Sequence, residues 1–494
     1  MDWNIVSKIL LPEFIVIFSI ILTIGMSLFE KSKKYVSVVA TVALVLASIV
    51  ASQTGIGGNV TKVLNSAFIS DTLCIYLRVL IYGVAALIAL ASKKYLDNFE
   101  SPAEYFPIFL SATLGAGFLA GVNDFLTLFI GLETLSLSSI LLASYTRKKQ
   151  ASNESGIKYL LTGASATSIL LLAISFLYGI TASTNFSLVA SRIVQLESIS
   201  AIAAPLKILI AALLVAAICF KLAAAPFHNW SPDVYYGAPT TTTLFLSVVS
   251  KIAGFAVAIR VFGTVFHNEF LLPLLAVVAV LSIVVGNFVG IIQVISRGSI
   301  KKLLAYSSIA QSGYLLVALA SLRLESVSSL LLYISIYALM NTAAFACIIH
   351  FERETGSDKI FDMAGLIHKK PMMAIVFVIA LFNLAGLPFI PAGFIAKFFL
   401  FASAFSSGIT YAPYLVIIAL LGSVVALFYY IYVAKLIIVD SPSHKLQSTV
   451  DEGPAFDFTK LSAVLSTALL VVIGIWGMDF LQGMTEMAIY KIGV

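Results

Sequence analysis

The chain has 494 residues, of which 60% are hydrophobic and only 11% are charged. A soluble globular domain cannot hide that much apolar surface from water, so the composition excludes one and indicates a polytopic membrane protein. The formal net charge of +6 comes without a dense basic cluster, which argues against nucleic-acid binding and suggests loop lysines that set orientation in the bilayer.

Apolar stretches recur from one end of the chain to the other, and a helix needs roughly 20 such residues to cross a bilayer core. We expect an all-α, polytopic bundle of about 14 crossing helices, joined mostly by short loops and without a soluble domain. The first stretch lacks the basic segment and the cleavage site of a signal peptide, so it counts as a span. The predicted ranges are 9–29, 35–53, 70–92, 105–121, 123–144, 157–182, 205–225, 240–262, 271–292, 300–322, 327–350, 372–403, 413–438 and 460–483.

Lysine and arginine are unevenly divided between alternate loops. About 17 lie on one side and about 5 on the other, and by the positive-inside rule the richer side is cytoplasmic. An even number of crossings then places both termini on the outer side. The localisation we expect is a bacterial inner membrane, with both termini in the periplasm.

Two of the predicted helices are interrupted by proline. The first interruption is Pro226 in "KLAAAPFHNWSPDVYYGAPT" (221–240), after which the chain can re-enter the bundle as half a helix; the second is "AGLPFIPAGF" (385–394) inside the long stretch 372–403. A proline costs a helix about 3 kcal/mol or more, and in lipid the freed backbone must be buried in protein or line a watery cavity. Broken helices five crossings apart favour an inverted internal repeat around a transport site. Two ordinary proline kinks are the alternative interpretation.

A charged side chain at the bilayer centre costs on the order of 2.5–3.5 kcal/mol, so each one requires an explanation. Glu133 and Lys251 lie at the middle of their predicted helices, too deep to reach the membrane surface easily. Lys221 and Lys397 flank the two interruptions. The remaining candidates lie nearer the ends of their segments, and they are Lys158, His228 and Glu13.

The candidates near segment ends have simpler explanations. Lys158 and Glu13 can extend along their side chains to the membrane surface, and His228 can be a hydrogen-bonded loop histidine. Lys301 and Lys302 are expected to belong to a cytoplasmic loop.

Buried lysines and a glutamate can carry protons without a metal. A lysine beside a carboxylate keeps its proton and releases it when the pair separates, and a histidine can pass protons between such groups. Hydroxyl-rich tracts such as "YSSIAQS" (306–312) can hold water between them. The sequence has no nucleotide-binding loop and no haem or cluster ligand set, and its three cysteines lie in apolar segments without a CxxC pair; they are Cys74, Cys219 and Cys347. We therefore expect a translocating protein without a cofactor or metal of its own.

The segment 221–240 resembles the signature of the antiporter-like membrane subunits of proton-pumping NADH:quinone oxidoreductase, respiratory complex I. Multisubunit cation/proton antiporters share this family. "KKLLAYSSIAQSGY" (301–314), "GLETLSLSS" (131–139) and "SNESGIKYLLTGA" (152–164) are further matches, and the resemblance covers nearly the whole chain. The length, the "LPE" opening and the lysine after the second interruption resemble the N-type subunits, the counterparts of mitochondrial subunit 2.

The resemblance implies two inverted five-helix repeats, each containing a broken helix. We expect three helices in 1–104, the first repeat in 105–262, the second in 271–438 and a C-terminal helix in 460–494. The implied roles are a paired Glu133 and Lys221, a central Lys251, and Lys397 as the station on the outer side. By the same resemblance, Lys158 and His228 are auxiliary groups.

The resemblance further implies a proton-translocating subunit within a hetero-oligomer of membrane subunits, surrounded by lipid and driven by quinone reduction elsewhere. FMN, iron–sulfur clusters and quinone would be bound by other subunits. Two alternatives stay open. One is a subunit of a multisubunit sodium/proton antiporter, and the other is a structural membrane subunit that translocates nothing.

Overall fold

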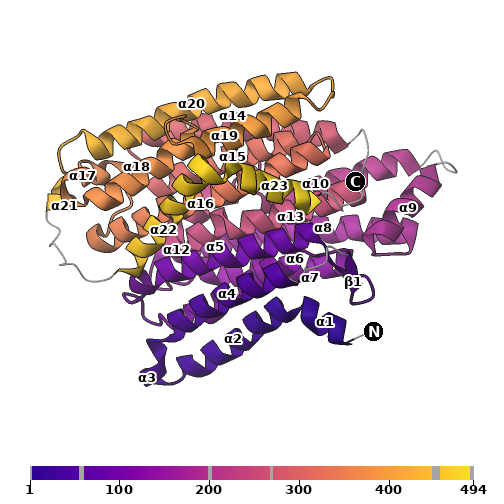
Figure 1. The fold of residues 1–494 in the computed structure, drawn as a ribbon, viewed down its shortest axis with the longest axis horizontal. Helices are drawn as coiled ribbons and strands as arrows, with labels where there is room; N and C mark the ends of the chain where they lie inside the picture. The colour runs from indigo at the N-terminus through magenta and orange to yellow at the C-terminus, as the bar shows by residue number, and fades with distance from the viewer. Residues whose placement is uncertain (1–2, 55–59, 198–202, 267–270, 448–456, 490–494) are drawn as a thin grey trace.

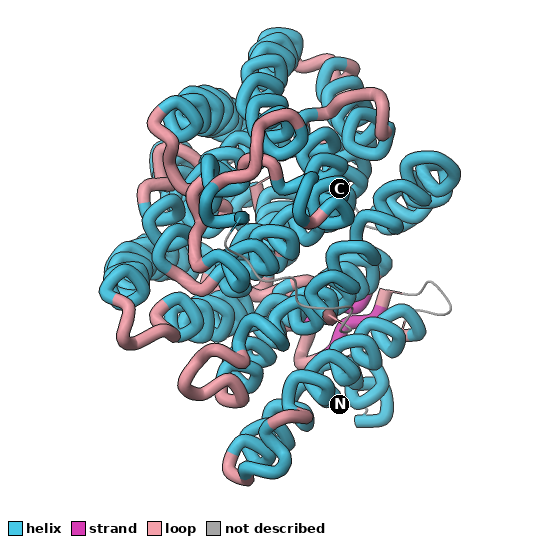
Figure 2. The backbone as a smooth tube through the Cα atoms, turned by 90° about the vertical axis from the view of Figure 1, so that its left-hand side faces the viewer, coloured by secondary structure: helices cyan, strands magenta, loops and turns pink. Residues whose placement is uncertain are grey.

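Helix accounts for most of the computed structural model, which describes residues 3–54, 60–197, 203–266, 271–447 and 457–489. A helix satisfies its backbone hydrogen bonds within one segment, so it is the structure that a chain this apolar adopts in lipid. Most helices run side by side, as Figure 1 shows from the side and Figure 2 shows nearly end-on.

The described part of the first half of the chain contains thirteen helices and one short hairpin. The helices are α1 (Trp3–Ile9), α2 (Leu11–Ser27), α3 (Glu30–Lys33), α4 (Val36–Gln53), α5 (Thr72–Leu96), α6 (Tyr105–Leu119), α7 (Phe125–Ala143), α8 (Gln150–Thr181), α9 (Phe186–Glu197), α10 (Ala203–Lys221), α11 (Trp230–Gly237), α12 (Thr240–Ser247) and α13 (Val249–Thr264). The antiparallel hairpin, β1 (Thr61–Val63) and β2 (Phe68–Ser70), lies between α4 and α5.

The second half is also helical. Its elements are α14 (Leu271–Ile295), α15 (Ile300–Leu319), α16 (Leu324–Thr355), the 3₁₀ turn η1 (Ile360–Met363), α17 (Leu366–Lys369), α18 (Pro371–Ala385), α19 (Pro391–Phe405), α20 (Ala412–Ile438), α21 (His444–Gln447), α22 (Phe458–Val472), the π-helical turn η2 (Ile473–Gly477) and α23 (Met478–Ile489).

Among the described residues, nine helices are long and apolar enough to cross a membrane when α12–α13 and α22–α23 are each counted as one span. The number is ten if the bent pair α1–α2, which meets at 69°, is also one span. This confirms the predicted mainly helical, polytopic membrane protein. Each of the 14 predicted ranges overlaps at least one helix. The number of crossings stays a prediction, because α6, α18 and α19 have only 15 residues each, about 22 Å of helix.

The two ends of the bundle differ. We call the end that carries α3, α17 and α21 the basic end, and the opposite end, which carries β1 and α9, the hairpin end (Figure 1). α3 and α17 each end in lysine, Lys33 and Lys369. α1 begins and α23 ends toward the hairpin end.

The helices also differ in how deeply they are buried. The apolar cores of α12–α13 and α16 are buried on all sides. In contrast, α2, α14 and α20 expose large apolar side chains such as Phe18, Phe288 and Phe428. An apolar exterior around a core that contains buried charges is the arrangement expected in a bilayer.

The predicted helix 240–262 corresponds to one apolar span, Thr240–Thr264, which contains a local irregularity. It is divided at Val248, whose backbone angles are φ −118° and ψ −72°, into α12 and α13. The sequence there contains neither proline nor glycine, so no local signal predicts the division. It lies within one turn of Lys251, and its consequence for that lysine is described below.

Candidate functional site

The first interruption lies inside the bundle, and neighbouring helices satisfy its backbone. α10 ends at Lys221, and regular helix resumes only with α11. In between, the Ala225 N–H donates to Ser282 Oγ on α14 (2.8 Å). Ser312 Oγ on α15 donates to the carbonyl oxygen of Leu222 (2.9 Å). The first part of the break, 222–225, is thus buried in protein, the condition under which lipid tolerates irregular backbone, whereas Pro226 and Asn229 are exposed.

Lys221 and Glu133 approach one another through hydroxyl groups. The Lys221 ammonium, on a residue only 6% exposed, donates to Ser136 Oγ on α7 (3.0 Å) and to the Tyr159 hydroxyl on α8 (3.5 Å). Glu133, three residues before Ser136, accepts a hydrogen bond from Thr167 (2.7 Å). Both Glu133 and Lys221 are among the described residues, and no direct ion pair joins them. The Glu133 charge nevertheless lies within electrostatic range of Lys221.

Lys251 is buried, no carboxylate pairs with it in the part of the chain that the structure describes, and a serine holds it. Its ammonium donates to both the carbonyl oxygen and the side-chain oxygen of Ser308 on α15, the latter at 2.6 Å. Ser308 in turn shares a hydrogen bond with the Tyr337 hydroxyl (3.0 Å). Tyr337 also donates to the carbonyl of Ser247 (3.3 Å), which lies next to the division between α12 and α13.

Lys397 closes the second interruption. Its ammonium donates to the carbonyl oxygens of Leu384 (2.8 Å) and Ala385 (3.2 Å), the last two residues of α18. It also donates to Ser423 on α20 (3.3 Å). Unpaired carbonyls give a helix C-terminus partial negative charge, which a cation stabilises. Gly386 follows with φ +82°, and a Cβ there would lie 3.1 Å from Lys397 Cδ.

One face of α15 connects these groups. Ser308, Gln311 and Ser312 are spaced at i, i+3 and i+4, so they lie on the same side of the helix. Ser308 holds Lys251, and Ser312 contacts the first interruption. The Gln311 amide donates to the carbonyl of Leu384 (3.3 Å), the same oxygen that Lys397 binds. The structure therefore links the first interruption, Lys251 and Lys397 through a single polar stripe.

The two auxiliary candidates lie apart from this stripe. Lys158, whose side chain is 42% exposed, pairs with Asp233 (2.6 Å) and Glu154 (2.7 Å). His228 is half-buried within the first interruption, with its side chain next to the backbone of Pro226. Within the described ranges, His228 makes no hydrogen bond to Glu133, Lys221, Lys251 or Lys397.

Sequence reasoning missed two buried arginines. Arg78 on α5 pairs with Glu13 on α2 at 2.8 Å, with side chains 0% and 5% exposed. Glu13 therefore does not extend to the membrane surface, and that interpretation is wrong. Arg260 on α13 pairs with Asp71 at 2.6 Å. An arginine inside a predicted span was the available signal for both pairs.

The prediction that Lys301 lies in a loop is also wrong. It belongs to the first turn of α15, is 5% exposed and donates to the carbonyl of Ala238 (3.3 Å), the residue after α11. Lys302 is more exposed and lies 3.8 Å from Asp233.

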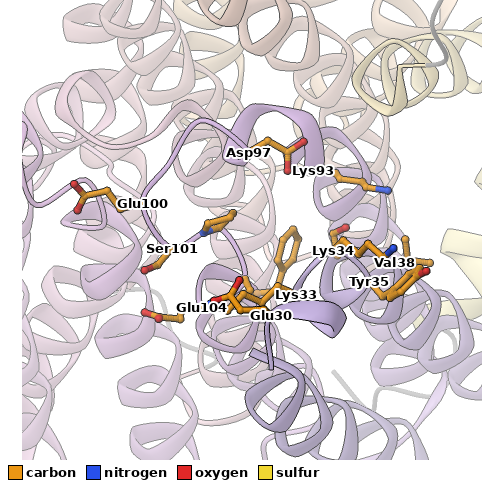
Figure 3. Close-up of a pocket in the computed structure, with 14 residues that line it drawn as sticks. Glu30, Lys33, Lys34, Tyr35, Val38, Lys93, Asp97, Glu100, Ser101 and Glu104 are labelled. Carbon is orange, nitrogen blue, oxygen red and sulfur yellow. The ribbon is translucent and has the colours of Figure 1, made fainter. Parts of the chain in front are cut away.

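An open hollow of about 840 Å³ lies between α3, the end of α5 and the start of α6 (Figure 3). Figure 3 shows charges of both signs around it, among them Lys33, Lys93, Asp97 and Glu104. None of its lining residues belongs to the polar stripe or to the interruptions, so it is separate from the candidate site.

Within the described residues, no group of three or more His, Cys, Asp or Glu side chains is arranged to hold a metal ion. Cys74, Cys219 and Cys347 are free and buried. The candidate site is accordingly built from lysines, one glutamate, hydroxyls, an amide and backbone carbonyls.

A helical membrane protein with two broken helices and a buried lysine at each break belongs to the class of antiporter-like membrane subunits. The family described as "NADH:quinone oxidoreductase/Mrp antiporter, TM" matches residues 122–426, and this chain is a member of it. The matched region contains both interruptions, the whole of α15 and the four candidate residues Glu133, Lys221, Lys251 and Lys397.

Curated relatives extend the likeness over most of the chain. NAD(P)H-quinone oxidoreductase subunit 2 of the Mesostigma viride chloroplast is 38% identical over 476 residues, covering 94% of this chain and 91% of the relative. The protein of the same name from Nostoc punctiforme is 38% identical and covers 91% and 84%.

Solved structures agree in fold. A chain of respiratory complex I from Thermus thermophilus matches with a TM-score of 0.78 at 26% identity, over 96% of this chain and 99% of that chain. A chain of the Mrp complex from Dietzia sp. has the same fold, with a TM-score of 0.80 at 19% identity over 99% and 98%.

Proposed function

We propose that this chain is a proton-translocating membrane subunit of an NAD(P)H:quinone oxidoreductase of the complex I type, corresponding to subunit 2. The observation that carries the proposal is the α15 stripe, which contacts the first interruption at Leu222, holds Lys251, and shares the Leu384 carbonyl with Lys397 at the second interruption. The curated relatives at 38% identity carry this name, and the chain covers most of their length.

The proposed route runs from Lys221 through Lys251 to Lys397. Lys221 packs against α13, since a Cβ at Gly254 would lie 3.6 Å from Lys221 Cγ, and Gly254 is three residues after Lys251. From Lys251 the route follows Ser308, Gln311 and the shared carbonyl of Leu384. Each lysine has hydroxyl or carbonyl oxygens around it, which can also hold water.

Glu133 is the proposed switch at the start of the route. In this structure Glu133 accepts a hydrogen bond from Thr167, while Ser136, on the same face of α7, accepts one from Lys221. A change of the Glu133 rotamer toward Lys221 would form the ion pair. An approaching carboxylate stabilises the charged form of a buried lysine, and its withdrawal favours proton release.

The proposed repeats, within 105–262 and 271–438, are supported by equivalent close packing of their first two helices. A Cβ at Gly115 on α6 would lie 2.7 Å from the backbone nitrogen of Leu135 on α7. A Cβ at Gly286 on α14 would lie 2.5 Å from the backbone nitrogen of Ala310 on α15. Only glycine permits backbones to approach so closely.

Matching these contacts makes Leu135 equivalent to Ala310. Glu133 then corresponds to Ser308, the residue that holds Lys251. The equivalent positions of the two repeats thus hold a carboxylate and a serine, which differ in proton affinity. Such an asymmetry is suited to moving protons in one direction along the route.

We further propose 14 crossings, with the basic end in the cytoplasm and both termini outside, following the positive-inside rule. The relatives come from a chloroplast and from cyanobacteria, so the proposed membrane is a bacterial inner membrane or its organellar equivalent. The chain would assemble with other membrane subunits, and FMN, iron–sulfur clusters and quinone would be bound by those subunits.

The test uses the assembled complex in sealed vesicles, with the proton-to-electron ratio and the quinone reductase rate measured together. Glu133→Gln and Lys251→Met keep side-chain size and should assemble, reduce quinone and give a lower ratio. Lys435→Met is the matched control, because Lys435 is 54% exposed and paired with Asp440 (2.6 Å) on the surface. Wild-type ratios in both buried variants would refute the assigned roles.

A sodium/proton antiporter subunit is the second candidate, favoured by the shared fold of the Mrp complex chain. It predicts sodium-dependent proton flux without an electron donor. A purified complex that shows such flux, and contains no quinone reductase subunits, would replace the first proposal.

A further inference from the structure

Asp71 and Arg260 form a fully bonded, buried ion pair toward the hairpin end of the bundle. The Arg260 guanidinium donates to both carboxylate oxygens of Asp71, at 2.6 and 2.7 Å, and its Nε donates to the carbonyl of Ala120 (3.0 Å). Asp71 also caps α5 by accepting from the Cys74 N–H (2.8 Å). These contacts tie α13 to α5 and to the end of α6.

Arg260 lies on the same half-helix as Lys251. α13 starts after the division at Val248, carries Lys251 in its first turn, and carries Arg260 nine residues later, about 13 Å along the axis. The division at Val248 is local, because the Val248 N–H still donates to Leu244 and the Ile252 N–H to Val248, and α12–α13 remains one span. The rotation of α13 therefore depends on α12 at one end and on further contacts at the other. The bidentate pair at the other end of α13 supplies such contacts.

We infer that Asp71 and Arg260 are positioning residues that set the rotation of α13 and so hold Lys251 on Ser308. The inference rests on the proposed role of Lys251. A side-chain atom roughly 6 Å from a helix axis moves by about 2 Å when the helix turns by about 20°. That displacement exceeds the range of a hydrogen bond, so a small rotation would separate Lys251 from Ser308.

Stability alone does not account for this pair. Exchanging a buried ion pair for well-packed apolar residues is often neutral or stabilising, whereas removing one partner strands the other charge. A double exchange therefore removes the constraint on α13 without leaving a buried charge.

The Glu13–Arg78 pair provides a matched control. It is equally buried and also involves α5, but it joins α5 to α2, and Arg78 also donates to the carbonyl of Ile9 (3.1 Å). None of the hydrogen bonds of this pair reaches α13.

The experiment compares Asp71→Leu/Arg260→Met with Glu13→Leu/Arg78→Met in the assembled complex. Both double variants should assemble and reduce quinone. We expect the first to lower the proton-to-electron ratio by the same fraction as Lys251→Met, with α13 rotated in its cryo-EM structure. The second should keep the wild-type ratio.

A third variant, Arg260→Lys, tests the inference if the double variant Asp71→Leu/Arg260→Met does not assemble. Arg260→Lys keeps the charge but loses the bidentate geometry, and we expect it to assemble with a partly lowered ratio. A wild-type ratio in Arg260→Lys, or in the assembled Asp71→Leu/Arg260→Met complex, overturns the inference. The proposed function still stands in that case if Lys251→Met has a lowered ratio. A wild-type ratio in Lys251→Met removes the proposed function itself.

Discussion

Gln311 and Lys397 donate hydrogen bonds to the same backbone oxygen, the carbonyl of Leu384, at 3.3 and 2.8 Å. That oxygen is free because α18 ends one residue later, so the second interruption creates the acceptor at which the stripe on α15 meets the last lysine. Interruption and polar stripe thus form one structural unit.

Gln311→Leu tests this meeting point. Leucine removes the amide that contacts Leu384 and the oxygen that accepts from Tyr333, while α15 itself should stay intact. We expect a lower proton-to-electron ratio at a nearly unchanged quinone reductase rate. Ser403→Ala is the control, since the buried Ser403 hydroxyl bonds only within α19, to Leu400 (3.1 Å). Equal ratios in the two variants would contradict a role for Gln311.

Gly386→Ala tests the close approach of the second interruption to Lys397. Alanine at φ +82° costs about 1–2 kcal/mol in backbone strain, and its methyl group would crowd Lys397 Cδ at 3.1 Å. We expect thermal destabilisation together with reduced proton pumping. Gly356→Ala carries similar strain at φ +65° with no atom within 4 Å, so it should destabilise the protein and leave the pumping ratio unchanged. A reduced ratio in both variants would attribute the effect to strain alone.

The sequence predicted the candidate residues but not their connections. Charges in apolar segments and prolines in helices stand out because each is costly in lipid, and those signals located Glu133, Lys221, Lys251 and Lys397. "YSSIAQS" was visible as a polar tract, yet its partners depend on which helices pack against α15. That information is tertiary and leaves no local pattern.

Two further features show where local signals end. The division at Val248 lies within "FLSVVSK", which contains no helix breaker. The neighbouring carbonyl of Ser247 accepts a hydrogen bond from Tyr337, which is 90 residues away in the chain. Arg78 and Arg260 carried the same signal as Lys251, a charge within a predicted span. Their partners were unpredictable from spacing, because Glu13 and Asp71 are 65 and 189 residues distant.

Lys158→Gln separates an exposed lysine from the buried ones. The Lys158 ammonium is shared between Asp233 and Glu154 and is accessible to solvent, so its ion pairs contribute about 1 kcal/mol or less. We expect an unchanged proton-to-electron ratio and a small change in thermal stability that shrinks in high salt. Lys221→Gln in the same assay is the comparison, with a clearly lower ratio. A loss in Lys158→Gln as large as that in Lys221→Gln would place Lys158 on the route.

The Asp457 carboxyl, at the basic end, is expected to make the stability of the protein depend on pH. Burial alone would raise the pKa of this carboxyl, but hydrogen bonds from His350 and Arg353, the Arg353 charge and the Thr459 N–H hold it well below the usual range. The native state therefore favours the charged form, and the stabilisation is complete above the unfolded pKa of about 4 and is lost as pH falls below it. Asp457→Asn would remove the short ion pair with Arg353 (2.7 Å) and leave Glu354 at 4.0 Å from the guanidinium, which we expect to destabilise the protein.

We expect the melting temperature of Asp457→Asn to fall below that of the wild type by a constant amount between pH 5 and 8. The difference should narrow below about pH 4, where the carboxyl of the unfolded wild type begins to take up a proton while the native carboxyl keeps its charge. Asp440→Asn is the control, because Asp440 pairs with Lys435 in an exposed position and its loss should change stability by about 1 kcal/mol or less. A difference between wild type and Asp457→Asn that grows as the pH falls from 8 to 5 would show that a different group governs the docking of α22 against α16.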